Sequence, residues 1–488
     1  MSSINDAGIS TYLGSKGYSI MKDAISLKEQ KYIRDALNVK PYIPNSIIKP
    51  NAFPIYRESK QKFYVPRYWG IETYGLPDEI RINKGNDIDI TFNGNLRDYQ
   101  KEIVDIYLKS TEGVNGGGGL LEIDVGMGKT VMALNIISKL KKKTLVIVHK
   151  SFLMNQWVER IKQFLPDAKI GKIQGKILDI DGKDIVIGML QSLSMKEYPQ
   201  EIYDEFGLTI IDECHHISSE VFSRSLKRIV TYYALGLSAT MQRKDGLTKV
   251  FKMFLGEVVC KKKRKGDEFV LVKGIDYYIN DDEFNEVKYD FRGNPAYSSM
   301  ITKLCKYNRR SDFIIKIIKK ELEIKKDQQI MILGQNKSIL KYLYDAISYH
   351  NISSVGYYVG GMKEEALKES ENKTIIIATY AMASEGLDIK TLTTLILVTP
   401  RTDVTQSIGR ILRVKHERPL VIDIIDHHDL FKKQWNKRKL FYKKCNYKII
   451  HTNNNLYNEQ KYEVLFDPLN KLNVKKKTKK KTCFITDL

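Results

Sequence analysis

An apolar run that ends in a glycine-rich turn constrains this chain more than any other feature of its sequence. Residues 120–125 favour a β-strand, and the turn Gly126–Thr130 that follows reads Gly-Met-Gly-Lys-Thr. Beyond the turn, apolar residues recur with helical spacing at Leu134, Ile137 and Leu140. A strand, a glycine-rich turn and a helix in this order are the parts of a phosphate-binding loop.

The residue types in the turn suit the phosphates of a nucleotide. Glycines allow backbone N–H groups to face the phosphates, and the positive end of the helix dipole adds to the attraction. Lys129 would reach the β- and γ-phosphates, and the Thr130 hydroxyl would ligate Mg²⁺. The strict pattern has glycine where this chain has Ile123, so an ordinary strand–turn–helix remains the alternative for the loop alone. The residues assigned to the nucleotide are Val125, Gly126, Met127, Gly128, Lys129 and Thr130.

Charge and cysteine content limit the setting in which this chain acts. Its formal net charge of +22 predicts a polyanionic partner, with a merely basic soluble protein as the alternative. The 5 cysteines are scattered without a CxxC or Cys/His spacing, which favours a reducing, intracellular compartment and argues against a zinc site. No apolar run approaches the roughly 20 residues that cross a bilayer, so no membrane association is expected. A chain of 488 residues is expected to form two or three domains.

The first part of the chain, residues 1–95, carries no catalytic motif. A short capped helix is expected at Ser26–Leu37. The stretch Tyr42–Tyr74 is rich in proline and aromatic residues, and with Arg57 and Arg67 it offers the residue types of a nucleic-acid stacking platform. The simpler interpretation, aromatic residues that pack a small accessory domain, is favoured.

Predicted strands and helices alternate around and after the loop, as in a parallel sheet with crossover helices. A helix that starts at Leu96–Gln100 precedes the loop. The Gln100 amide has the donor and acceptor needed to read adenine, although by itself a surface glutamine on an amphipathic helix is the simpler interpretation. The strands expected after the loop are Thr144–Val148, Asp184–Gly188, Leu208–Ile211 and Ala234–Leu237.

Two adjacent carboxylates, Asp212 and Glu213, follow the third of these strands directly. Parallel sheets bind their ligands at this edge, where the strands end. An aspartate there can hold phosphate-bound Mg²⁺, directly or through water, and a glutamate beside it can orient and deprotonate the attacking water. An isolated Asp-Glu pair is usually a solvated turn. This pair ends an apolar strand downstream of a Gly-Lys-Thr loop and is followed by Ser238-Ala239-Thr240, which favours the catalytic interpretation.

Four motifs in the first half resemble the first RecA-like lobe of a superfamily 2 helicase: Leu96–Gln100, Gly126–Thr130, Asp212–His216 and Ser238–Thr240. The second lobe is expected to follow, because Ala383–Asp388 matches motif V and Gln406–Arg413 matches the motif VI pattern QxxGRxxR. The resemblance implies an α/β fold of two tandem RecA-like lobes, with parallel sheets flanked by helices, a small N-terminal accessory module and a basic C-terminal tail. The implied domains are an accessory module at 1–95, an ATP-binding lobe at 96–260, a second lobe at 261–430 and an extension at 431–488.

The resemblance also implies roles for single residues, with ATP and Mg²⁺ as the cofactors. Thr130 and Asp212 would hold the metal, while Glu213 and Lys129 would act in catalysis. Arg410 and Arg413 lie three residues apart, on one helical face, and would serve as arginine fingers. Further nucleotide contacts are implied for Gln100, Asp212, Gly386 and Asp388. The residues that would couple the nucleotide to lobe movement are His215, Ser238, Ala239, Thr240 and Gln406. The residues that would contact nucleic acid are His149, Lys150, Ser151, Gln191, Ser192, Thr379 and Ser384.

Within the superfamily, the residues around Gln100, the pair Gln156-Trp157 and the stretch Ser238–Gly246 are most similar to the XPB/Rad25 branch. That branch includes UvsW-type phage helicases and the helicases of large nucleocytoplasmic DNA viruses. Together with a composition typical of AT-rich genomes, this favours a giant-virus enzyme located in the virion and the host cytoplasm. Because poxvirus members act in transcript release, the resemblance implies viral transcription as the process, RNA polymerase or transcription factors as partners, and a monomer.

Two basic segments and three functions remain open. Lys261–Lys265 suits a phosphate contact, a nuclear-import address or a solvated linker, and the lysine-rich end Lys475–Lys481 suits non-specific attraction to nucleic acid. The favoured function is a helicase or translocase that acts on DNA. An RNA helicase and an ATP-gated binding scaffold, or a motor subunit that separates no strands, are the alternatives.

Overall fold

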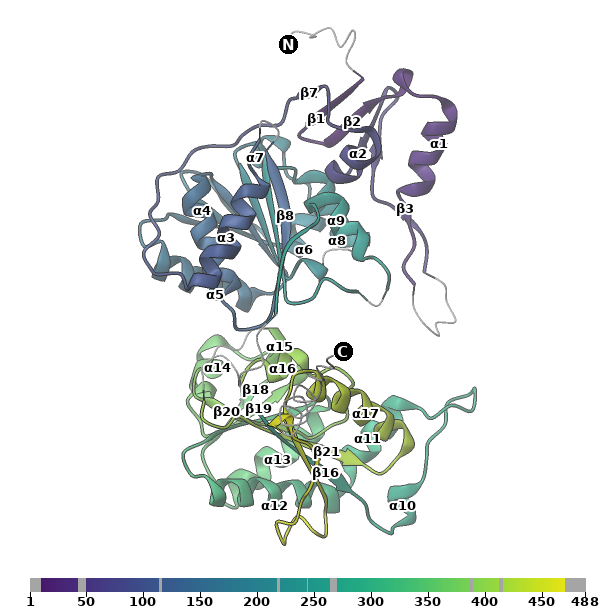
Figure 1. The fold of residues 1–488 in the computed structure, drawn as a ribbon, viewed down its shortest axis with the longest axis vertical. Helices are drawn as coiled ribbons and strands as arrows, with labels where there is room; N and C mark the ends of the chain where they lie inside the picture. Colours follow the sequence, from purple (N-terminus) through teal and green to yellow (C-terminus); the bar gives the residue numbers. More distant parts are fainter. Residues whose placement is uncertain are drawn as a thin grey trace, which may run out of the picture. The chain divides into compact units, whose positions relative to one another are not determined.

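Figure 1 shows the chain as a computed structural model. The residues that the structure describes are 10–42, 50–113, 116–216, 220–243, 245–263, 270–385, 389–411 and 416–469, without the side chains of His216, Phe222, Ser384 and Glu385. The chain divides into two compact units, Met1–Arg264 and Lys265–Leu488. Within the described residues, no helix combines the length and the apolar character needed to span a bilayer.

The N-terminal module is built on a five-stranded sheet with the strand order β5-β6-β2-β1-β7. Its first α-helix confirms the expected capped helix, because the Ser26 side chain accepts a hydrogen bond from the Glu29 N–H and the Glu29 carboxylate accepts one from the Ser26 N–H. The elements of the module are β1 (Thr11–Gly14), β2 (Gly17–Met21), η1 (Lys22–Ala24), α1 (Leu27–Ala36), β3 (Asn38–Val39), β4 (Phe53–Pro54), β5 (Arg57–Glu58), β6 (Lys62–Val65), α2 (Arg67–Tyr74) and β7 (Glu79–Ile80).

Two arginines of the module are used to attach it to the first lobe. Arg57 Nη2 donates to the Lys227 carbonyl at 2.5 Å, and Arg67 Nη1 donates to the Tyr232 carbonyl at 3.0 Å. Phe53, Phe63 and Trp69 are buried in the core of the module, whereas Tyr42 is exposed. The structure therefore supports the accessory domain over an open stacking platform at these three positions. The buried aromatic residues that pack with helix α9 (Thr248–Leu255) are Tyr18, Phe53, Phe63 and Trp69.

The first lobe contains an eight-stranded sheet in the order β11-β10-β12-β9-β13-β14-β8-β15, parallel except for the edge pair of β10 and β11. Its strands are β8 (Gly117–Ile123), β9 (Thr144–Val148), β10 (Ile170–Gln174), β11 (Ile177–Asp179), β12 (Ile185–Met189), β13 (Leu208–Asp212), β14 (Tyr233–Ser238) and β15 (Val258–Lys262). Its other helices are α3 (Asp98–Ser110), α4 (Lys129–Leu140), α5 (Ser151–Phe164), α6 (Leu190–Met195), α7 (Gln200–Asp204), η2 (Cys214–His216) and α8 (Glu220–Arg228).

Helices cover both faces of this sheet, as the apolar strands require. Alternate residues of β13 show the two faces. Ile210 packs in the core under α3, α4 and α5, whereas Ile211 packs in the core under α6 to α9. Figure 1 shows the two groups of helices on opposite sides of the strands.

The glycine run before the loop belongs to the sheet and is not the flexible connector that glycine content suggests. Residues 117–119 are the first three residues of β8, and all three are buried. A Cβ on Gly118 would lie 2.6 Å from the Tyr68 hydroxyl oxygen, and one on Gly119 would lie 2.5 Å from a Val259 methyl carbon. Glycine is therefore needed here because neighbouring groups approach the strand closely.

The basic segment after the first lobe begins as a strand of that lobe. Lys261 and Lys262 belong to β15, which pairs with β8. Lys261 Nζ lies 2.7 Å from a Glu122 carboxylate oxygen, and Lys262 Nζ lies 2.9 Å from one of Glu102. These two lysines are thus paired with carboxylates; positions 264–269 lie outside the described residues.

The second unit contains another eight-stranded sheet, in the order β18-β19-β17-β20-β21-β16-β22-β23, parallel except for the last pair. Its strands are β16 (Leu271–Tyr277), β17 (Gln329–Gly334), β18 (Val355–Tyr358), β19 (Ile375–Thr379), β20 (Leu392–Leu397), β21 (Leu420–Asp426), β22 (Lys448–Asn453) and β23 (Glu463–Phe466). Its helices are α10 (Asp282–Asn285), α11 (Tyr297–Lys306), α12 (Asn308–Ile324), α13 (Lys337–Tyr349), α14 (Glu364–Glu371), α15 (Tyr380–Glu385), α16 (Thr405–Ile408) and α17 (Asp429–Lys444). Two parallel-sheet lobes and a small N-terminal sheet confirm the expected α/β fold.

The C-terminal part of the chain completes this second sheet. Strand β22 pairs along β16, and α17 packs on the sheet through a buried ion pair. Arg438 Nε lies 2.7 Å from a carboxylate oxygen of Asp423 in β21, which also accepts a hydrogen bond from the Tyr442 hydroxyl at 2.8 Å. A buried charge is tolerated when it is paired and hydrogen-bonded in this way.

Candidate functional site

The glycine-rich turn connects the end of β8 to the start of α4. Gly126 and Gly128 have φ angles of 79° and 85°, a region that L side chains rarely adopt. A Cβ on Gly128 would lie 2.4 Å from Gln100 Nε2, so the site has no room for a side chain there. The turn has the backbone shape and the helix N-terminus that a phosphate group needs, which means that this part of the chain fits a nucleotide.

Lys129, the first residue of α4, contacts Glu213, the second carboxylate of the Asp-Glu pair. Its Nζ lies 3.3 Å from Glu213 Oε1 and donates to the Ile123 carbonyl at 3.4 Å. Both side chains of this ion pair are largely buried. Thr130 follows in the same helical turn, half-buried. The structure therefore brings together the lysine of the loop and the glutamate at the end of β13.

Asp212 is held by two hydrogen bonds at the end of β13. Trp157 Nε1 donates to Asp212 Oδ2 at 2.9 Å, and the Glu213 backbone N–H donates to Oδ1 at 3.1 Å. Burial raises the pKa of Asp212 and the neighbouring Glu213 charge raises it further, while the indole hydrogen bond opposes the shift. The Asp212 carboxylate thus has a fixed orientation.

Trp157 is a site residue that the sequence did not identify as one. It lies on α5 with 1% of its side chain exposed, and it was notable in the sequence only as part of the Gln-Trp pair. A buried tryptophan needs a partner for its N–H, and that need was the available signal. The partner could not be inferred from sequence because α5 and β13 are separated along the chain.

Glu213 has a left-handed backbone, with φ of 49°, which is uncommon for a residue other than glycine. Burial acts to raise the pKa of Glu213, but Lys129 and His215 outweigh it, so the pKa lies well below its usual range. Glu213 is therefore a carboxylate in this site, and its oxygens have partners on three sides. Ser238 Oγ donates to Oε2 at 3.2 Å, and His215 Nδ1 lies 3.4 Å from the same oxygen.

The Ser-Ala-Thr motif contacts the Asp-Glu motif directly. Ser238 Oγ lies 2.8 Å from His215 Nδ1 and 2.7 Å from the Thr240 carbonyl oxygen. The Thr240 backbone N–H in turn donates to Ser238 Oγ at 3.2 Å. Arg243 Nη1 donates to the His215 carbonyl, so the segment after β14 closes over the end of β13. Ala239, which lies between the two polar residues of the motif, is half-buried.

Gln100 lies next to the loop with both ends of its amide occupied by backbone groups. Its Nε2 donates to the Met127 carbonyl at 3.0 Å, and its Oε1 accepts from the Arg97 N–H at 2.9 Å. The residue is buried, with 6% exposed, so it is not the surface glutamine of the simpler interpretation. In this structure Gln100 holds the shape of the loop.

Candidate nucleic-acid contacts in the first lobe lie at the ends of β9 and β12. Gln191 Nε2 donates to the His149 carbonyl at 2.7 Å, and Ser192 Oγ accepts from the Gly175 N–H at 2.9 Å. Lys150 and Ser151 precede and begin α5. The parallel strands bring these segments to one edge of the sheet. His149 itself is buried, with 8% of its side chain exposed.

The candidates in the second unit form a separate group. Arg410 Nε donates to the Ala383 carbonyl at 2.7 Å, and 6% of Arg410 is exposed. The expected helix of the QxxGRxxR stretch ends at Ile408, before Arg410, with a C-cap at Gly409, the poorest helix former besides proline. Gln406 lies within α16, and the Thr379 hydroxyl accepts a 3.4 Å hydrogen bond from the Met382 N–H. Outside the described residues lie Arg413, Gly386, Asp388 and the side chain of Ser384.

Two family models match the chain over these motifs. The model described as "Type III restriction enzyme, res subunit" matches residues 93–243, which include the loop and the Asp-Glu pair. The model described as "Helicase conserved C-terminal domain" matches residues 312–415 in the second unit. The two matches follow one another in the order expected of the two lobes.

Among similar proteins, a candidate ATP-dependent RNA helicase of Acanthamoeba polyphaga mimivirus is 37% identical over 472 residues, which cover 94% of this chain and 90% of that protein. The DNA 3′-5′ translocase XPB2 of Sulfurisphaera tokodaii is 27% identical over 406 residues, which cover 74% of this chain and 89% of that protein. A solved structure of S. cerevisiae Dbp5 bound to RNA and ADP-BeF3 has a TM-score of 0.51 at 12% identity, covering 73% of this chain and 91% of that one, a likeness of fold. The chain belongs to the superfamily 2 helicases and is an ATP hydrolase.

Proposed function

We propose that this chain is an ATP-driven translocase or helicase that moves on DNA. The observation that carries the proposal is the cluster around Glu213, in which Lys129, His215 and Ser238 converge on one carboxylate. A protein that only bound ATP would not need a carboxylate kept ionised beside the phosphate-binding lysine. The similarity to the XPB2 translocase supports DNA as the track.

In the proposed reaction, the first lobe binds the nucleotide in the loop Val125–Thr130. Lys129 leaves Glu213 for the phosphates, which frees the carboxylate to orient and deprotonate water. Thr130 and Asp212 would hold Mg²⁺, which supplies charge neutralisation on the phosphate oxygens. Gln100 retains a second N–H and a second lone pair, and with these it would read adenine while still holding the loop.

Completion of the site is proposed to require the second lobe. Arg410 and Arg413 would neutralise the charge that develops on the transferred phosphoryl group, with further nucleotide contacts from Gly386 and Asp388. Arg410 must then leave its contact with the Ala383 carbonyl. His215, Ser238, Ala239, Thr240 and Gln406 would link the state of the nucleotide to lobe movement.

The nucleic-acid surface is proposed at the strand ends of both lobes, with phosphate contacts that tolerate any sequence and weaken with salt. We assign residues 1–95 to the accessory module, 96–260 and 261–430 to the lobes and 431–488 to the extension. A role in viral transcription, with RNA polymerase or its factors as partners, is proposed from the viral relatives. The residues that would contribute to the nucleic-acid surface are His149, Lys150, Ser151, Gln191, Ser192, Thr379 and Ser384.

A second candidate is an RNA helicase, favoured by the name of the mimivirus relative. The ATPase rate measured without nucleic acid, with single- and double-stranded DNA and with single-stranded RNA separates the two candidates. Stimulation by DNA well above RNA, absent in Glu213→Gln, is the result expected for a DNA translocase. Stimulation by RNA alone would favour the second candidate, because the 2′-hydroxyl is what distinguishes the two strands. Turnover equal to that of Glu213→Gln under all conditions would reject both.

A further inference from the structure

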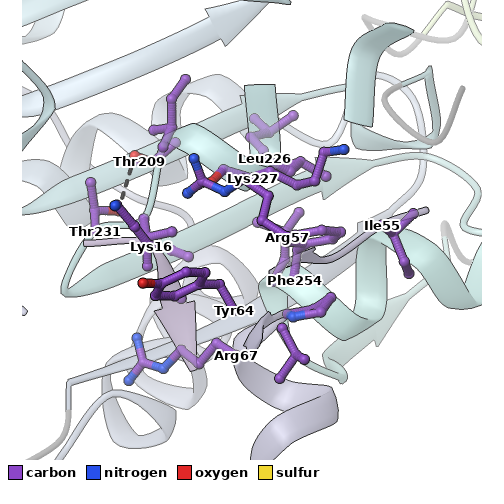
Figure 2. A pocket seen from close by; sticks show the side chains of 18 of the residues that line it. Lys16, Ile55, Arg57, Tyr64, Arg67, Thr209, Leu226, Lys227, Thr231 and Phe254 are labelled. Atoms are coloured by element: carbon purple, nitrogen blue, oxygen red, sulfur yellow. Dashed lines mark hydrogen bonds between the residues drawn. The ribbon is translucent and has the colours of Figure 1, made fainter. Parts of the chain in front are cut away.

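A pocket lies between the N-terminal module and the first lobe (Figure 2). Three cations of the module line it, Lys16, Arg57 and Arg67, and α8 contributes a fourth, Lys227. Among the described residues that line the pocket there is no aspartate or glutamate. Several cations around a partly enclosed space whose described lining holds no carboxylate attract anions.

The pocket is distinct from the proposed nucleotide site. Thr209 and Ile211 of β13 line it, and successive side chains of a strand point to opposite faces of the sheet. Asp212 therefore faces the other side, toward α5 and Trp157. The Thr209 hydroxyl is already engaged, because Thr231 donates to it at 2.9 Å, the bond drawn dashed in Figure 2.

Burial and repulsion between neighbouring positive charges both destabilise the charged forms of the pocket cations. Burial lowers the pKa of Arg57, and the charge of Arg228 lowers it further. Burial likewise lowers the pKa of Lys227, with Arg57 as the next cause. The Lys227 backbone carbonyl accepts a hydrogen bond from Arg57 at 2.5 Å. A neutral carbonyl stabilises the guanidinium only in part, because it carries no full negative charge. An anion between these groups would remove the repulsion.

The side chains keep donors for such an anion. The single hydrogen bond that the described residues give Arg57 uses one of its five N–H groups. Lys227 Nζ donates to the Pro54 carbonyl at 3.1 Å, and an ammonium group has three donors. Lys16 Nζ lies 5.3 Å from the centre of the Tyr64 ring, at the turn between β1 and β2. In Figure 2 the charged ends of Lys16 and Arg57 lie to the left in this view and that of Lys227 lies to the right.

We propose that this pocket binds a phosphate group and thereby fastens the N-terminal module to the first lobe. A phosphate offers several acceptor oxygens and up to two negative charges, which match an arginine fork and two ammonium groups. Both the module and the lobe supply ligands, so the bound phosphate bridges them. The phosphate comes either from inorganic phosphate in solution or from the backbone of a nucleic-acid strand.

The test is the thermal unfolding of the full chain against inorganic phosphate at constant ionic strength set with chloride. The wild type is compared with Lys16→Gln/Lys227→Gln and with a control, Lys162→Gln/Lys176→Gln, which removes two exposed lysines elsewhere on the first lobe. Phosphate is expected to raise the Tm of the wild type and the control. In the pocket variant, Lys16→Gln/Lys227→Gln, the phosphate concentration that gives half of the Tm increase should rise by at least about tenfold. This is the loss of affinity expected when charge-assisted hydrogen bonds are removed.

The loop at Lys129 also binds phosphate, but equally in all of these variants, so the difference between them reports on the pocket. In Lys129→Ala, the part of the phosphate-dependent Tm increase that comes from the pocket should remain. If the double variant does not fold, Lys16→Gln alone serves, because Lys16 is exposed and anchors no backbone group among the described residues. A pocket variant with the wild-type response, or a response to chloride as large as that to phosphate, would overturn the proposal.

Binding of a single-stranded oligonucleotide to the same variants identifies the source of the phosphate. Weaker oligonucleotide binding by the pocket variant assigns the phosphate to a strand. Unchanged oligonucleotide binding, together with the lost phosphate response, assigns it to free phosphate. Both results support the site.

Discussion

Lys129 Nζ lies 3.3 Å from Glu213 Oε1, so the lysine of the phosphate-binding loop and the glutamate proposed to activate water neutralise each other in the free chain. Neither group is free for its proposed task in this arrangement. A nucleotide that draws Lys129 to its phosphates releases the carboxylate at the same time. This pairing couples nucleotide binding to the readiness of the base.

Glu213→Gln should separate binding from hydrolysis. The substitution removes the charge that holds Lys129, so ATP should bind at least as tightly as to the wild type. Hydrolysis should fall by about 10²–10⁴, the usual contribution of a general base. Fluorescent-nucleotide binding and single-turnover hydrolysis measure the two quantities, with Lys129→Ala as the variant that loses binding. Weaker ATP binding by Glu213→Gln would contradict the pairing argument.

Trp157→Phe should weaken the metal site while keeping the packing of α5. Phenylalanine fills most of the space but has no N–H for Asp212 Oδ2. Loss of such an orienting hydrogen bond costs about 10–100-fold in metal affinity. The Mg²⁺ concentration that gives half-maximal ATPase rate should rise accordingly, whereas Trp435→Phe in the second unit should leave it unchanged. An unaltered Mg²⁺ dependence in Trp157→Phe would exclude this role.

Arg410→Ala should abolish turnover and spare ATP binding. Residues that neutralise the transferred phosphoryl group contribute about 10³–10⁵ in rate. Arg418→Ala, a change at an exposed arginine of the same unit, is the control. Steady-state ATPase and equilibrium nucleotide binding give the two readouts. Turnover within a few-fold of wild type would remove Arg410 from the mechanism.

His451 should make the second unit less stable as the pH rises. Its Nε2 lies 3.3 Å from Asp276 and its Nδ1 lies 3.1 Å from Glu463, and the Asp276 contact raises the pKa of His451 above 6.5 although burial opposes it. A histidine whose pKa is higher in the folded than in the unfolded chain stabilises the fold. This stabilisation is complete when the pH is below the unfolded-state pKa, and it is lost as the pH rises through the folded-state pKa. The stability difference between wild type and His451→Gln, measured by urea unfolding, should therefore be largest below pH 6.5 and decline above it. A difference that grows with pH would contradict this.

Local patterns were sufficient for the sheets and for the separate parts of the site. Thr144–Val148 is a strand with the bounds that its apolar run predicts, and the run Leu208–Ile211 forms β13 with only Asp212 added. The contacts of Lys129 with Glu213 and of His215 with Ser238 join motifs that were recognised one by one. These parts were predictable because each motif is a short, local pattern.

What could not be predicted depends on neighbours that are distant in the chain. The Trp157 bond to Asp212, the burial of Arg67 and the half-buried position of Arg57 arise from the packing of separate elements. The place of the glycines at 117–119 in a crowded strand cannot be predicted from composition, because a flexible connector can have the same glycine content. The end of α16 at Ile408 likewise follows from the turn at Gly409, which helical spacing alone did not reveal.

ATP-driven movement along DNA is the central property of the proposed function, and it can be measured directly. A third strand bound to a duplex by triplex pairing is displaced only by a protein that travels along the duplex. Displacement of the third strand is expected by the wild type with ATP and not by Glu213→Gln. Neither protein should displace the strand when ATP is omitted. ATP hydrolysis by the wild type without displacement on DNA, or displacement that persists in Glu213→Gln, would contradict the proposed function.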